Sequence, residues 1–261
     1  MKKHLGILIE MVAISCIPFF FLSGCKSDHS QVDATIQIDG ANEFQKIDGF
    51  GVNINSSWLY NAEYQNADVV KPAIDMLVDD LGATIFRVVI EEMDWEAVND
   101  DNNPGNFNWP YYNKVFSNAR FQGTWNTLRY LNKKGITTGL MISFMGGPPA
   151  WMGTNYTVEP AKEAEFIESI AALLWYARNK AGVQFTLVSP VNETELNGKE
   201  GPNMNDAKQV TRVIKNLALK LDDIGMSDIR FVVPDAAGDS LFNECLDEMV
   251  KDPYLMGKLA V

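Results

Sequence analysis

The sequence predicts an α/β fold, specifically a (β/α)8 TIM barrel of which only part is present. Short apolar runs alternate with longer segments of helical periodicity from residue 49 onward. The runs are nearly continuous in apolar residues, which is typical of parallel strands covered by helices. No phosphate-binding glycine fingerprint follows the first run, and the long segments after each run favour a barrel over an open sheet.

The five expected strands follow one another with a helix after each. They cover residues 49–54, 84–89, 138–144, 185–191 and 229–233. Leu259–Val261 is expected to begin a sixth strand, so about five to six of the eight βα units are present. An earlier alternating segment, Thr35–Asp39, is predicted to be a strand of a side β-sandwich.

Helices are predicted where apolar residues recur three and four positions apart. Four such stripes are clear, and a fifth is weaker. In order they cover residues 70–81, 125–131, 166–177, 210–224 and, most weakly, 241–250. We interpret these stripes as core faces and not as binding surfaces.

The first 34 residues carry a targeting pattern. Two lysines precede an apolar stretch, Leu5–Leu22, and Leu22-Ser23-Gly24-Cys25 resembles the bacterial lipoprotein signal. Residues 1–24 are therefore predicted to be a signal peptide and residues 25–34 a tether. The protein is expected to be exported and anchored in a membrane by a lipid on Cys25, at the bacterial envelope or cell surface. A plain signal peptide or an uncleaved anchor is the alternative.

Composition limits the chemistry of residues 35–261, which we take as one truncated barrel domain. The chain has 261 residues and a net charge of −12, so nucleic acid is excluded as a partner. Both histidines, His4 and His29, precede the domain, which excludes His-based triads and the usual zinc sites. We expect no metal and no cofactor. Cys245 is expected to be a small core hydrophobe.

Two polar features interrupt the apolar runs. Leu187–Val191 is followed directly by Asn192 and Glu193, at the strand end where barrels carry catalytic groups. A glutamic acid held there can protonate the bridging oxygen of a sugar, although an Asn-Glu pair can also be a surface turn. Arg87 lies within the second run and requires a carboxylate partner.

Four ordered motifs within residues 45–201 resemble glycoside hydrolase family 30, in its N-terminal portion. They are Gln45–Gly51, Phe86–Val88 with Asp94, Pro148–Met152 and Ser189–Glu193. This family belongs to the clan A retaining glycosidases and includes glucosylceramidase-like enzymes and endo-β-1,6-glycanases. Two departures are Thr194 in place of a proline and Val52 in place of a glycine.

The resemblance implies roles for the polar residues. Glu193 would be the acid/base, and Asn192 would bind the sugar 2-OH. Arg87 would orient the nucleophile, or else form a structural ion pair with another acid. Asp94 would bind sugar hydroxyls, with its neighbours Glu91 and Glu92 as rivals.

Two tryptophans are expected to contact substrate. Trp151 would wall the cleft and stack on a pyranose ring, and Trp58 is a weaker candidate. The alternative for Trp151 is a packed loop side chain.

The family places its nucleophilic glutamate after the seventh strand, which residues 1–261 do not include. Asp235 follows the fifth strand, but capping of the next helix is the better interpretation of that residue. The expected function is therefore a retaining β-glycosidase that hydrolyses O-glycosidic bonds of a β-linked polysaccharide or glycoconjugate, with residues 1–261 alone inactive. A non-catalytic carbohydrate-binding lipoprotein and another clan A glycanase, cellulase- or xylanase-like, remain alternatives.

Overall fold

A computed structural model describes residues 39–42, 44, 46–55, 67–91, 94–196, 198 and 200–260. Residues Ile47–Val261 form one compact unit. The expected signal peptide, the tether with Cys25, and nearly all of the strand at 35–39 lie outside the described residues.

One parallel sheet runs through this unit, with its strands in sequence order. The strands are β1 (Gly51–Asn55), β2 (Ile85–Glu91), β3 (Leu140–Met145), β4 (Leu187–Ser189) and β5 (Arg230–Phe231). A parallel bridge joins Phe231 to Leu259, where the sixth strand is expected to begin. Sequential order without reversal is typical of a barrel and not of a doubly wound sheet, so the fold class is confirmed for the described part.

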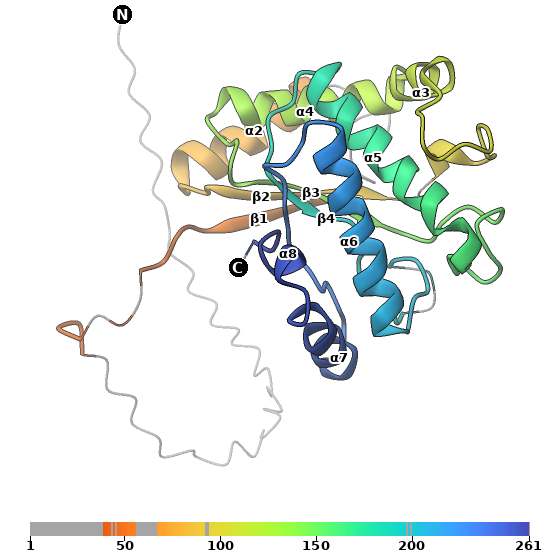
Figure 1. The fold of residues 1–261 in the computed structure, drawn as a ribbon. Helices are drawn as coiled ribbons and strands as arrows, with labels where there is room; N and C mark the ends of the chain where they lie inside the picture. The colour runs from red at the N-terminus through yellow and green to blue at the C-terminus, as the bar shows by residue number, and fades with distance from the viewer. Residues whose placement is uncertain are drawn as a thin grey trace, which may run out of the picture. The chain divides into compact units, whose positions relative to one another are not determined.

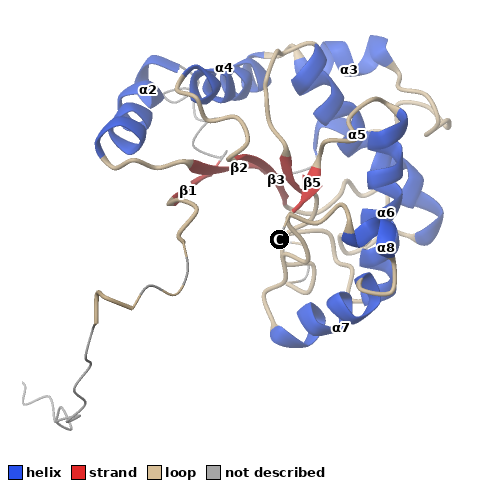
Figure 2. Ribbon diagram, turned by 60° about the vertical axis from the view of Figure 1, so that its left-hand side comes forward, coloured by secondary structure: helices blue, strands red, loops and turns tan. Residues whose placement is uncertain are grey.

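The five expected helices are all present. They are α2 (Ala67–Asp75, continued by a π-helical turn, Met76–Asp80), α4 (Ala119–Lys133), α5 (Glu163–Asn179), α6 (Ala207–Asp223) and α7 (Asp239–Met249). Two short helices were not predicted, α3 (Trp109–Phe116) and α8 (Pro253–Met256). Figures 1 and 2 show the helices placed around one side of the curved sheet.

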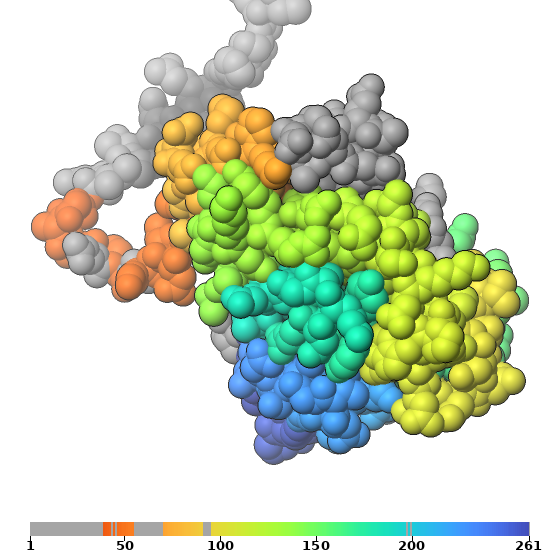
Figure 3. All heavy atoms as spheres, turned by 90° about the horizontal axis from the view of Figure 1, so that it is seen from above, coloured from red at the N-terminus to blue at the C-terminus, as the bar shows by residue number. Residues whose placement is uncertain are grey.

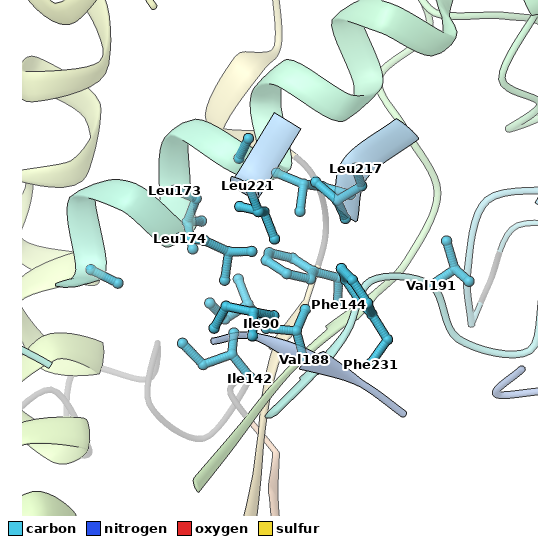
Figure 4. Close-up of a cluster of buried hydrophobic side chains, with 14 of the residues drawn as sticks. Ile90, Ile142, Phe144, Leu173, Leu174, Val188, Val191, Leu217, Leu221 and Phe231 are labelled. Carbon is cyan, nitrogen blue, oxygen red and sulfur yellow. The ribbon is translucent and has the colours of Figure 1, made fainter. Parts of the chain in front are cut away.

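The core lies between the sheet and these helices. In Figure 3, α4, α5 and α6 lie side by side as green, teal and blue bands. Figure 4 shows Ile142, Val188 and Phe231 of three neighbouring strands beside Leu173 of α5 and Leu217 of α6, and all five are buried. Alternate strand residues therefore point outward to the helices, which leaves the intervening ones for the inner face of the sheet.

Polar side chains occupy that inner face. Arg87, Ser143 and Ser189 alternate with the buried apolar residues of β2, β3 and β4. Cys245 is buried and unoxidised in α7, as expected for a small core residue. No helix in the described part of the chain has the length and apolar character needed to cross a membrane.

Candidate functional site

Arg87 is the centre of a polar network on the inner face of the sheet. Its Nη2 donates to Ser143 Oγ at 2.9 Å, to Asn192 Oδ1 at 2.6 Å and to Asp235 Oδ2 at 2.8 Å. One guanidinium thus joins β2 to β3 and to the segments that follow β4 and β5. The expected carboxylate partner is confirmed, and it is Asp235.

Asp235 was expected to cap the next helix, and that expectation is wrong. The N-cap of α7 is Gly238, which makes no side-chain capping bond. Asp235 Oδ2 accepts hydrogen bonds from Arg87 and, at 2.9 Å, from Ser189 Oγ. Both carboxylate and guanidinium are about a quarter exposed, at 26% and 24%. Asp235 pairs with Arg87 instead of capping α7, because a guanidinium on a largely buried strand face needs a counterion nearby.

Asn192 is oriented from two sides. Its Oδ1 accepts from Arg87, and its Nδ2 donates to the carbonyl of Glu200 at 3.2 Å. Asn192 is itself buried, with 3% of its surface exposed. A Cβ on Gly201 would lie 1.7 Å from the Asn192 carbonyl, so only glycine permits this close approach.

Glu193 lies in the loop that follows β4, four residues after the last strand residue, and not on an outer helix. Its backbone N–H donates to the carbonyl of Asp235 at 2.6 Å, which ties it to the segment after β5. Its φ is 40°, in the left-handed region that a side chain such as glutamate rarely adopts. Such strain persists only where the surroundings hold it, and it occurs preferentially at functional sites.

The structure thus brings three predicted site residues together: Arg87, Asn192 and Glu193. Asn192 and Glu193 follow the carboxyl end of β4, the face where barrel enzymes carry their active sites, and Arg87 reaches Asn192 from within β2. Trp58 lies outside the described residues, as do the side chains of Asp94, Glu91 and Glu92. The substrate-binding roles of these residues stay predictions.

Trp151 lies in the loop that follows β3, beside the segment that follows β2. Its indole Nε1 donates to the carbonyl of Glu96 at 2.8 Å, and the Lys162 ammonium lies 5.3 Å from the ring centre. The ring is half-buried against the core and still partly accessible. Trp151 is therefore a loop side chain held in place by these contacts, with part of its ring accessible to solvent. Among the described residues, no contact links it to Arg87.

The sequence did not point to Ser143 or Ser189 as site residues. Ser143 Oγ accepts from Arg87, and the Ser189 hydroxyl donates to Asp235. Nor did it point to four acidic residues near Trp151, which are Glu96, Asp100, Glu165 and Glu168. A hollow of about 540 Å³ lies at the other end of the sheet, beside Thr137, Thr138 and Thr186. Those residues precede β3 and β4, so the hollow opens at the amino-terminal face, which in barrels serves stability.

No protein-family model matches the chain, and no curated protein matches it. Solved structures do match. A glycoside hydrolase family 30 subfamily 8 xylanase from Clostridium acetobutylicum is 18% identical, with a TM-score of 0.57, over 85% of this chain and 50% of that one. The catalytic domain of a family 30 xylanase from Talaromyces cellulolyticus is 17% identical, with a TM-score of 0.60, over 84% and 53%.

An endo-β-1,6-glucanase is 16% identical, with a TM-score of 0.59, over 86% of this chain and 53% of that one. The chain therefore spans about half the length of these solved structures. At such identities the likeness shows the fold alone, which is part of a TIM barrel as in those structures. The resemblance found in the sequence motifs is confirmed at this level.

Proposed function

We propose that residues 47–260 form the acid/base half of the cleft of a retaining β-glycosidase. The observation that carries the proposal is the placement of Asn192 and Glu193 just past the carboxyl end of β4, with Asn192 held by Arg87 of β2 and the Glu193 backbone held by the Asp235 carbonyl. The fold shared with family 30 hydrolases supports the same assignment.

In this proposal Glu193 protonates the leaving oxygen and later removes a proton from water. Asn192 donates its second Nδ2 hydrogen to the sugar 2-OH, a contact that strengthens as the oxocarbenium-like transition state forms. The proposal assigns the nucleophilic carboxylate to a seventh strand, which residues 1–261 do not include. Arg87 then has two roles. It orients Asn192 through a hydrogen bond, and it places a positive charge beside the attacking carboxylate.

The test compares Glu193→Gln with the parent in a protein extended through the reading frame downstream of residue 261. We expect kcat/KM for substrates with poor leaving groups to fall about 10²- to 10⁴-fold. Aryl β-glycosides with activated leaving groups need little protonation, so their cleavage should fall far less. Glu195→Gln is the matched control, because Gln keeps an oxygen to accept from Gly238 N–H, and it should retain activity.

Equal losses on both substrate classes, or no loss, would refute the acid role of Glu193. The non-catalytic alternative predicts oligosaccharide binding without turnover in the extended protein. A panel of β-1,4-xylan, β-1,6-, β-1,3- and β-1,4-glucans identifies the linkage. We propose a β-linked polysaccharide or glycoconjugate as the substrate class.

We also propose that Cys25 carries a lipid that anchors the exported protein at the envelope or cell surface. The support is the motif Leu22–Cys25 after an apolar stretch. Expression with labelled palmitate should place label and protein together in the membrane fraction. Cys25→Ser should abolish labelling and release the protein from membranes, and Cys245→Ser, which removes a buried thiol, should not. Labelling that survives Cys25→Ser would contradict the anchor.

A further inference from the structure

Four carboxylates meet in the interior beneath Trp151, and we name them the acidic cluster. Glu96 and Asp100 come from the segment after β2, while Glu165 and Glu168 come from α5. Glu96 and Glu168 have no exposed surface, and Glu165 is 6% exposed. Glu165 and Glu168 are three residues apart, so they lie on one face of α5.

The distances within the acidic cluster suit one cation. Single carboxylate oxygens of Glu96, Asp100 and Glu165 all lie within 4.8 Å of one another. Calcium holds its oxygen ligands at about 2.3–2.6 Å, so two oxygens on opposite sides of the ion are about 4.6–5.2 Å apart. The three oxygens therefore fit around a single calcium ion without displacement of the backbone.

The buried oxygens also lack protein partners. Both oxygens of Glu168 are buried with no hydrogen-bond partner among the described residues, as are Glu96 Oε1, Asp100 Oδ2 and Glu165 Oε2. The hydrogen bonds that do reach the cluster include one from the Tyr112 hydroxyl to Glu96 Oε2 at 2.9 Å, one from Asp101 N–H to Asp100 Oδ1 at 2.7 Å, and one from the Asp100 backbone to Glu96. Polar groups buried this deeply are normally satisfied, so this exception points to an absent ligand.

The donor set identifies the chemical class of that ligand. The four carboxylates supply only hard oxygen donors, which suit a divalent cation such as calcium.

We propose that the acidic cluster is a calcium site, with Glu96, Asp100 and Glu165 as ligands and Glu168 as a fourth carboxylate that completes the shell. Bound calcium joins the segment after β2 to the first half of α5. One neighbouring bond already follows this path, because Trp95 Nε1 donates to Ser169 O of α5. Trp151, in the loop after β3, donates to Glu96 O, so an ion on Glu96 also holds the residue that positions Trp151.

The first test uses the purified 261-residue chain after chelation and dialysis. Calcium titrated by calorimetry should bind at one site per chain, with a Kd no weaker than about 1 mM. The melting temperature should rise with calcium concentration, because the ion binds only the folded state. The affinity should increase from pH 6 to pH 8, since protons must leave the acidic cluster before the ion binds. Terbium should give luminescence sensitised through Trp95 and be displaced by calcium.

Variants locate the site. Glu168→Gln and Glu96→Gln should each lower calcium affinity at least about tenfold. Glu244→Gln, at an exposed glutamate that accepts from Ser240, should bind like the parent. If a buried variant does not fold, Asp100→Asn at the half-buried member replaces it.

Absence of saturable binding to the parent up to about 10 mM calcium would overturn the proposal. So would equal affinities in all variants, or tighter binding of magnesium than of calcium. Calorimetry and luminescence need no sugar, so these outcomes are independent of the glycosidase proposal.

Discussion

Arg87 shows how one side chain fixes the arrangement of a whole rim. Its Nη2 reaches three acceptors that lie 56, 105 and 148 positions further along the chain. The need for a carboxylate was predictable from a cation within an apolar strand. Its partner was not, because Asp235 comes near only after β4 and β5 pair in register.

At this scale we predict that Asp235→Asn destabilises the protein by about 1–2 kcal/mol, because two charge-assisted hydrogen bonds are weakened and Arg87 loses its counterion. Urea unfolding followed by circular dichroism measures the change. Asp228→Asn is the matched control, since Asp228 pairs with Arg178 at 2.6 Å but is 54% exposed. Exposed pairs contribute less, so it should cost under about 1 kcal/mol. Equal losses in the two variants would contradict the structural role of Asp235.

The elements were largely predictable because their burial follows simple periods. The five expected helices and the first five expected barrel strands are present, yet β4 and β5 are shorter than their apolar runs. Val191 is buried although β4 has already ended at Ser189. Burial alone produces an apolar run, while a strand also needs a ladder of hydrogen bonds. The apolar pattern therefore marks the core better than it marks the strand ends.

Helix α3 and the acidic cluster were missed for different reasons. α3 spans eight residues and buries only Tyr112 and Phe116, which is too short a stripe for a clear period. The four acids come from two separate segments, and glutamates on a helix are normally solvated. A signal was present, because Glu165 and Glu168 interrupt the apolar stripe of α5, which is buried on nearly all sides.

Titration of the acidic cluster makes the stability of the whole chain depend on pH. Burial raises the pKa of Glu96 to about 8 and that of Glu168 to about 9, whereas both ionise near their ordinary pKa of 4.5 when unfolded. Between these limits the folded state holds more protons than the unfolded state. The contribution of these two protonated carboxyls to the free energy of unfolding is therefore fully present below about pH 4.5. It is lost progressively as the pH rises toward 9. Asp222 and Asp252, whose ion pairs lower their pKa, lose their contribution only at more acidic pH.

We accordingly predict that, in chelator, the free energy of unfolding falls by about 1 kcal/mol or more per pH unit between pH 6 and pH 8. Urea titrations at a series of pH values measure the slope. Glu168→Gln removes one of the two titrating carboxyls, so its slope should be clearly smaller, while Glu244→Gln should keep the parent slope. Saturating calcium should flatten the parent curve, because the ion takes the place of the protons. A parent slope near zero in chelator would mean that the buried carboxylates are ionised and compensated in the folded chain, and would remove the electrostatic need for a cation.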